Sequence, residues 1–158
     1  MIPDGGARNQ ITESSFVPQL IDGREYIPLQ SRMKGMDVFS FGITTAPKSV
    51  KKLAEHFGFD YLSYDYLVLH QANMKMNSMI AKKLKFEKER VPSSMWNFGN
   101  TSSASIPLTI ATQLREQCTS GRVSLLCCGF GVGLSWGTVA LNVENIVIPN
   151  LVEVDEFK

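Results

Sequence analysis

This chain of 158 residues has few cysteines and histidines and almost no net charge. Three cysteines, two of them adjacent at Cys127 and Cys128, make no paired disulfide framework, which favours a reducing compartment. The two histidines, His56 and His70, lie far apart in the sequence, and no CxxC or HExxH pattern accompanies them. The sequence therefore predicts no metal site, and we expect no cofactor.

The net charge of +1 gives no electrostatic field for gripping nucleic acid. Residues 1–90 hold 23 of the 31 charged side chains, whereas 91–114 and 123–143 hold none. The second uncharged stretch is long enough to raise the question of a membrane span. Its four glycines and its polar residues fit two buried strands around a glycine turn better. The N-terminus lacks the basic and apolar segments of a signal peptide, so we expect a cytoplasmic protein. From the net charge and the composition of residues 123–143, we expect it neither to bind nucleic acid nor to span a membrane.

Hydrophobic periodicity and chain-breaking residues indicate alternating strands and helices. The leading segment, 1–30, is expected to be loose, with a hairpin turned at Asp22-Gly23. Helices are expected at 37–57 (kinked or divided by Pro47), at 73–84 and at 102–117. Strands are expected at 66–69, 94–96, 123–128 and 134–143. We expect residues 31–143 to form the main domain and 144–158 a β-rich acidic tail. The predicted class is α/β, with a mixed sheet flanked by helices.

Two polar residues stand where an expected strand gives way to a helix, the usual place of functional groups in α/β sheets. His70 follows the strand at 66–69. Asn100 lies in Gly99-Asn100-Thr101-Ser102-Ser103, between a strand-like run and a helix. Position alone leaves each residue a plainer interpretation as well: a histidine that bonds locally, and an ordinary turn residue.

A glycine-rich turn, Gly129-Phe130-Gly131-Val132-Gly133, joins the last two expected strands. A strand follows it, not a helix with a phosphate-binding lysine, which argues against a nucleotide loop. A structural hairpin and an oxyanion-stabilising turn both stay open. No cysteine nucleophile is evident, because Cys127 and Cys128 lie in an apolar strand, where a free cysteine behaves as a small hydrophobe.

Lysines gather on the helix expected at 73–84, opposite its apolar stripe. Such a run usually marks a solvated face. The functional alternative is a docking patch for an acidic partner, which would act mainly on the rate of encounter. The lysines are Lys75, Lys82 and Lys85, with Lys83 nearer the edge of the stripe.

Three segments taken together resemble β-ketoacyl-acyl carrier protein synthase III, a thiolase-fold condensing enzyme. They are His70-Gln71-Ala72-Asn73, Gly99-Asn100-Thr101-Ser102-Ser103-Ala104-Ser105 and Phe130-Gly131-Val132-Gly133-Leu134-Ser135-Trp136-Gly137. Their order and spacing match the C-terminal half of that enzyme, over about residues 30–143. The His-Gln-Ala-Asn form points to type III and away from the elongating enzymes and thiolases. The resemblance implies a thiolase-like layered fold.

The resemblance also implies a chemistry. In the family a cysteine accepts an acyl group from acyl-coenzyme A, and malonyl-acyl carrier protein then decarboxylates and attacks it. His70 and Asn100 match the residues that hydrogen-bond the malonyl thioester oxygen. Gly131, Val132 and Gly133 match the turn that serves the acyl-cysteine oxyanion. The positions that match the pantetheine tunnel are Met33, Gly35, Phe39, Ala72, Asn73 and Phe130. Those that match the carrier-docking face are Lys75, Lys82 and Lys83.

This sequence departs from the family pattern at several points, which affects what activity and which acyl substrate we expect. The acyl-accepting cysteine belongs to the N-terminal half, and nothing here corresponds to that half, so we expect this chain alone to be inactive. Its partners would be the missing half and, once complete, a second copy in a homodimer. Val132, Met36 and Ser40 replace residues usual in the family, which leaves the acyl substrate open. The alternatives are a non-catalytic module for carrier binding or assembly, and an α/β domain whose motifs are structural relics.

Overall fold

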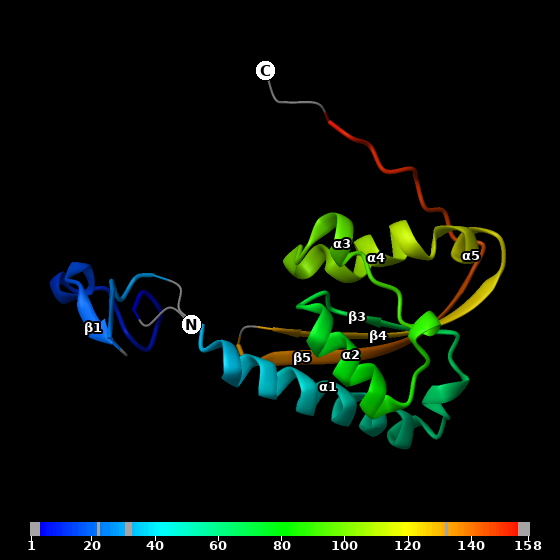
Figure 1. Cartoon of the computed structure of the whole chain (residues 1–158), viewed down its shortest axis with the longest axis horizontal. Helices are drawn as coiled ribbons and strands as arrows, with labels where there is room; N and C mark the ends of the chain where they lie inside the picture. The colour runs from blue at the N-terminus through cyan, green and yellow to red at the C-terminus, as the bar shows by residue number, and fades with distance from the viewer. Residues whose placement is uncertain (1–3, 22, 31–32, 132, 155–158) are drawn as a thin grey trace. The chain divides into compact units, whose positions relative to one another are not determined.

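The chain divides into two compact units, Met1–Val38 and Phe39–Lys158. The computed structural model (Figure 1) describes residues 4–21, 23–30, 33–131 and 133–154. In the first unit, η1 (Glu13–Phe16) precedes β1 (Gln19–Ile21) and β2 (Arg24–Tyr26). These two strands pair antiparallel, with Ile21 opposite Arg24. Asp22 of the expected turn lies outside the described residues, and Gly23 has a φ of +75°, which glycine adopts without strain.

The second unit contains most of α1 (Gly35–Phe57) and every later element. Its strands are β3 (Tyr66–Leu69), β4 (Arg122–Gly131) and β5 (Ser135–Glu144). Its later α-helices are α2 (Met74–Leu84), α3 (Met95–Phe98), α4 (Ser105–Gln113) and α5 (Arg115–Thr119). Short 3₁₀ turns are η2 (Tyr61–Ser63), η3 (Lys88–Arg90) and η4 (Ser102–Ala104).

The three strands of the second unit form one mixed sheet in the order β3-β4-β5. β3 runs parallel to β4, with Leu67 opposite Leu126, and β4 runs antiparallel to β5. The predicted α/β class with a mixed sheet is therefore confirmed. Because β3 and β4 are parallel, the chain must cross over between them, and the crossover carries α2, α3, α4 and α5.

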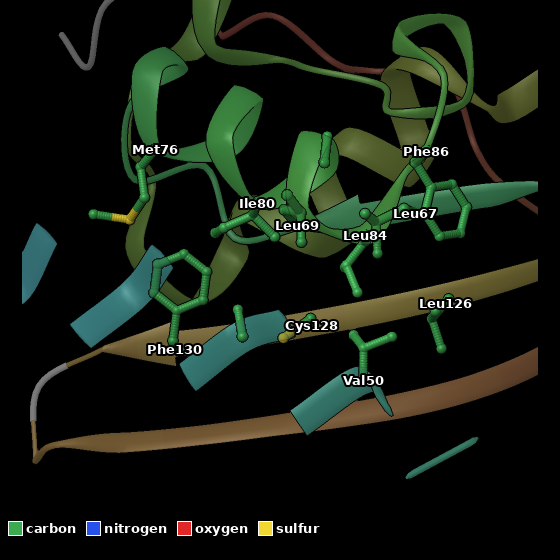
Figure 2. Packing of buried hydrophobic residues seen from close by; sticks show 12 residues of the cluster. Val50, Leu67, Leu69, Met76, Ile80, Leu84, Phe86, Leu126, Cys128 and Phe130 are labelled. Carbon is green, nitrogen blue, oxygen red and sulfur yellow. The ribbon is translucent and has the colours of Figure 1, made fainter. Parts of the chain in front are cut away.

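Helices cover both faces of this sheet (Figure 1). On one face, α1 and α2 pack against the sheet around a cluster that includes Val50, Ile80 and Leu126. Figure 2 shows the α2 side chains Met76, Ile80 and Leu84 reaching toward this core. On the other face, α4 and α5 cover Val68, Leu125 and Cys127. The unit is thus a three-layer α/β/α sandwich, with β4 as its central strand.

β5 corrects one expectation, because only the first of the two predicted buried strands is buried. β4 carries six buried residues, whereas β5 has none. Val139 pairs with Cys127, and Leu141 pairs with Leu125. Their β4 partners are buried, yet Val139 is 52% exposed and Leu141 38% exposed.

Across the described residues, no helix is long and apolar enough to cross a membrane.

Residues 94–96, predicted as a strand, are instead the N-cap and the first two residues of the helix α3. The backbone of this segment satisfies its hydrogen bonds locally. The N–H of Met95 donates to Ser93 Oγ at 3.3 Å, and the N–H groups of Asn97 and Phe98 both donate to the Ser94 carbonyl. A serine side chain that caps a turn in this way competes with a strand ladder.

The single helix expected at 102–117 is broken into η4, α4 and α5. Leu114 separates α4 from α5 with φ −123° and ψ 13°, and its side chain is buried in the core. Packing here overrides helix propensity. The tail predicted to be β-rich has no strand over residues 145–154, although Ile146 and Ile148 pack against the core.

α1 runs through Pro47 without being divided, contrary to one of the expected outcomes. Proline has no backbone N–H, so the carbonyl four residues earlier, that of Ile43, loses its helical partner. Lys83, from α2, replaces that partner: its Nζ donates to the Ile43 carbonyl at 2.9 Å. The long helix is thereby tied to α2 at the turn where its own ladder is interrupted.

This exchange of donors predicts a coupling between Lys83 and Pro47. Lys83→Met should lower the free energy of unfolding by about 1 kcal/mol, because the Ile43 carbonyl loses its donor. In a Pro47→Ala background the new backbone N–H reaches the same carbonyl, so Lys83→Met should then cost little. Urea unfolding of the four chains measures the interaction. Lys82→Met is the matched control, and equal losses in both backgrounds would contradict the assignment.

Candidate active site

His70 follows directly on β3, at the carboxyl end of the strand. Its backbone N–H donates to the Cys128 carbonyl at 2.9 Å, which continues the β3–β4 ladder by one residue. Four residues later the chain enters α2 at Met74. Asn73 caps that helix, since its Oδ1 accepts from the Met76 N–H at 2.8 Å. The main chain of His70 is therefore fixed on both sides.

Two groups from other segments hold the His70 ring. Ser105 Oγ lies 2.7 Å from Nδ1, and the Phe130 ring stands edge-on at 5.4 Å between ring centroids. Burial lowers the pKa of the imidazole below its ordinary value of 6.5, and a hydrogen bond with the backbone of Ser102 partly opposes this shift. Because the pKa is lowered overall, the imidazole is neutral at neutral pH.

Asn100 lies in an exposed turn before η4. The preceding Gly99 has a φ of +63°, a backbone conformation that glycine adopts without strain. Asn100 Oδ1 accepts from the Ser102 N–H at 3.0 Å. The amide oxygen is thus committed to the turn, and none of the hydrogen bonds in the described part of the chain engages the two N–H donors on Nδ2.

Ser102 connects the two candidate catalytic residues. Its N–H bonds Asn100, and its backbone also bonds His70. Residues that are 30 positions apart in the sequence therefore border one short turn, η4. An amide donor and a neutral imidazole that share one hydrogen-bond partner are groups of the kind that can stabilise an oxygen that gains negative charge.

Sequence reasoning assigned no role to four buried polar residues behind His70: Gln71, Ser94, Ser105 and Thr109. Gln71 is fully buried. Its Nε2 donates to the Leu69 carbonyl at 2.7 Å, and its Oε1 accepts from Ser93 Oγ at 2.9 Å. Polar residues of this kind are usually exposed, so composition does not predict their burial. The one sequence signal for a role is that Gln71 and Ser105 lie inside the matched motifs.

The glycine turn between β4 and β5 is described only at its ends. Gly131 is the last residue of β4, and Gly133 is exposed with a φ of +147°. Val132 lies outside the described residues. The oxyanion role of this turn stays a prediction.

The residues matched to the pantetheine tunnel fall in both units. Met33, 71% exposed, and Gly35 belong to the unit Met1–Val38, whereas the others belong to Phe39–Lys158. Phe39 and Ala72 pack partly buried against the core, and Phe130 is buried beside His70. Asn73 uses its side-chain oxygen as the cap of α2. Pantetheine binding at these positions stays a prediction.

The lysines matched to the docking face all lie on α2, and all three are exposed. Lys75 lies in the first turn of α2, at the N-terminal end of the helix, which follows His70 in the sequence. The ammonium group of Lys83 donates a hydrogen bond to the Ile43 carbonyl. Lys75 and Lys82 are therefore better suited than Lys83 to contact an acidic partner.

The cysteines behave as the sequence predicts, as buried thiols and not as activated nucleophiles. Burial raises the pKa of the Cys127 thiol to about 11, and it also raises the pKa of Cys118 and Cys128. A raised pKa suppresses the thiolate that a nucleophile requires. Within the described ranges, no group of three or more His, Cys, Asp and Glu side chains is placed to hold a metal ion.

Solved structures place this fold among known ones. The 3-oxoacyl-(acyl carrier protein) synthase from Burkholderia xenovorans superposes with a TM-score of 0.76 at 35% identity, over 92% of this chain and 40% of that one. Synthase III from Pseudomonas aeruginosa gives 0.68 at 38% identity, over 73% and 37%. The fold and the site define a thiolase-like α/β domain of the condensing-enzyme type.

The family follows from a match to a family model and from two curated relatives. A family model for the C-terminal part of 3-oxoacyl-[acyl-carrier-protein] synthase III matches residues 54–143, and the chain belongs to this family. The curated β-ketoacyl-[acyl-carrier-protein] synthase III of Trichodesmium erythraeum is 34% identical over 142 residues, which is 85% of this chain and 43% of the relative. The chloroplastic synthase III of Arabidopsis thaliana is 36% identical over 110 residues, 70% and 27% respectively. The chain thus spans less than half the length of these relatives.

The lowered pKa of His70 predicts a pH dependence of stability. The unfolded histidine takes up a proton near pH 6.5, while the folded one resists it, so the unfolded state binds more protons as the pH falls. The stability contributed by neutral His70 is therefore fully present above about pH 6.5 and is lost as the pH falls through the lower folded value.

The measurement is the free energy of unfolding in urea between about pH 7.5 and about pH 5. We expect a smaller loss of stability over this interval in His70→Gln than in the wild-type chain. His56→Gln is the control for removing an imidazole. Asp65, whose pKa is lowered mainly by its hydrogen bond with Ser124, acts only at pH below its ordinary 3.8. Identical losses in His70→Gln and wild type would refute the prediction.

Proposed function

We propose that this chain is the C-terminal catalytic half of an acyltransferase of the β-ketoacyl-acyl carrier protein synthase III type. The reaction would be a decarboxylative Claisen condensation of an acyl thioester with malonyl-acyl carrier protein. The observation that carries the proposal is that His70 and Asn100 share Ser102 as a hydrogen-bond partner, while among the hydrogen bonds of the described residues none engages the Asn100 Nδ2 donors. A neutral imidazole and an amide N–H can donate without a change of protonation.

In the proposed reaction, the bond between the malonyl carboxylate and its methylene carbon breaks and CO₂ leaves. The electron pair moves onto the thioester oxygen as an enolate, where His70 and Asn100 donate hydrogen bonds. The enolate carbon then attacks the carbonyl of the acyl-cysteine, and the tetrahedral oxyanion receives a backbone N–H of the Gly131–Gly133 turn. Collapse of this intermediate expels the cysteine thiolate and releases the β-ketoacyl product on its carrier. Each donor is expected to supply about 3–4 kcal/mol of transition-state stabilisation.

The acyl-accepting cysteine has to come from elsewhere, because the three cysteines here are buried with raised pKa values. We propose that it lies in the N-terminal half that the family possesses. The complete enzyme would be a cytoplasmic homodimer that takes acyl-coenzyme A and malonyl-acyl carrier protein as substrates.

The 158-residue chain alone should form no acyl-enzyme. Incubation with acyl-coenzyme A and an intact-mass measurement test this, and a stable adduct would contradict the proposal. Fused to the cysteine-bearing half of the Trichodesmium relative, the chain should decarboxylate malonyl-carrier protein. There His70→Ala and Asn100→Ala should each lower kcat by roughly 10²–10³-fold. His56→Ala and Asn97→Ala are the matched controls, and unchanged decarboxylation in both site variants would reject the assigned roles.

The docking surface makes a separate prediction for the chain itself. Lys75→Glu combined with Lys82→Glu should slow association with acidic carrier protein by roughly ten-fold at low ionic strength, because the two exposed ammonium groups steer the encounter. The effect should shrink with added salt. Arg122→Glu is a charge-reversal control at the start of β4, the opposite end of the strand from the His70 edge. Equal slowing by Arg122→Glu would show that net charge, and not this face, governs binding.

A further inference from the structure

The buried polar residues of the second unit are concentrated behind His70. Within the described ranges, five polar residues of this unit are buried, and four of them are Gln71, Ser94, Ser105 and Thr109. Buried hydroxyl and amide groups are costly unless each finds a partner. Their gathering at one place, next to a candidate catalytic residue, therefore calls for a functional explanation.

The hydrogen bonds among these residues have defined directions. Thr109 Oγ1 donates its one proton to the Ser105 carbonyl at 2.8 Å. Ser94 Oγ, 2.8 Å from Thr109 Oγ1, must then be the donor of that bond. Gln71 Oε1 accepts from the Ser94 N–H at 3.2 Å, which joins this chain of bonds to the residue after His70. The network holds the start of α4 against the end of β3.

Ser105 is the member that reaches the His70 ring. Its Oγ accepts from the Gln71 N–H at 3.3 Å and lies 2.7 Å from His70 Nδ1. Among the hydrogen bonds of the described residues, Nδ1 is the one acceptor for the Ser105 hydroxyl proton. If Nδ1 carried the ring proton, the hydroxyl of Ser105, a residue only 1% exposed, would lose its acceptor, which is unfavourable for a buried donor.

We propose that Ser105 is a positioning residue for His70: its hydroxyl donates to Nδ1 and so keeps the neutral ring protonated at Nε2. The Gln71, Ser94 and Thr109 side chains hold Ser105 in place. The hydrogen bond with the Ser102 backbone favours a ring proton, so the ring is its donor. From Nδ1 this bond would compete with Ser105, whereas from Nε2 it agrees with the proposed tautomer and is the bond that the enolate oxygen would replace. The inference rests on the proposed function, in which a protonated Nε2 is the donor to the enolate oxygen.

The tautomer can be read without any activity. Two-bond ¹⁵N–¹H correlation spectra of the ¹⁵N-labelled 158-residue chain, recorded above the pH at which His70 titrates, distinguish a protonated Nε2 from a protonated Nδ1. Since the chain has two histidines, the His56→Gln variant assigns the His70 signals. We expect a single Nε2–H tautomer. A dominant Nδ1–H tautomer in the wild-type chain would overturn the proposal, and no variant is needed for that outcome.

Variants then test whether Ser105 is the cause. Ser105→Ala should convert the single tautomer into a mixture, and Ser105→Thr, which keeps the hydroxyl, should restore it. Ser103→Ala, an exposed neighbour, should change nothing. An unaltered Nε2–H tautomer in Ser105→Ala would overturn the proposal. In the fused enzyme, Ser105→Ala should lower kcat with little change in KM. An intact tautomer together with no condensation would count against the proposed function, and not against the role of Ser105.

Discussion

The parallel pairing of β3 with β4 is the constraint on which the rest of the second unit depends. It places two buried rows of side chains on opposite faces of the sheet and so requires helices on both sides. It also extends one hydrogen bond beyond β3, from the His70 N–H to the Cys128 carbonyl. The position of the candidate catalytic histidine is thus set by the same ladder that holds the core together.

Long-range hydrogen bonds provide partners for polar groups that the local backbone structure leaves without one. Pro47 removes a donor from α1, and a lysine from α2 supplies it at the Ile43 carbonyl. The segment before α3 is not part of the sheet and hydrogen-bonds Gln71 through Ser93 and Ser94. In both places a side chain that looks like a surface or motif residue serves to join two elements. For Lys83 this changes the interpretation of a basic helix face, because one of its charges is structural.

Much of the site could be predicted from sequence, because it rests on short-range signals. The apolar run before His70, the cap at Asn73 and the glycine before Asn100 each depend on a few neighbouring residues. The strand predicted at 94–96 was wrong because its backbone bonds are satisfied by Ser93 and Ser94, and the helix at 102–117 was broken because Leu114 packs into the core. The predicted burial of β5 was wrong, because helices cover β3 and β4 but leave β5 without a buried residue, and Val139 and Leu141 are exposed.

The sequence by itself determined the class of fold, the type of family motif at His70 and Asn100, and the unreactive setting of Cys127 and Cys128. These follow from periodicity, from motif residues in a fixed order, and from apolar surroundings, all of which are local in the chain. Only the tertiary structure decided that Ser105 bonds the His70 ring, that Ser102 links His70 with Asn100, and that Lys83 completes α1. The contacts of Ser105 and Ser102 with His70, and of Lys83 with Ile43, join residues that are 32 to 40 positions apart. Nothing in the local pattern encodes which distant polar group a buried donor will meet.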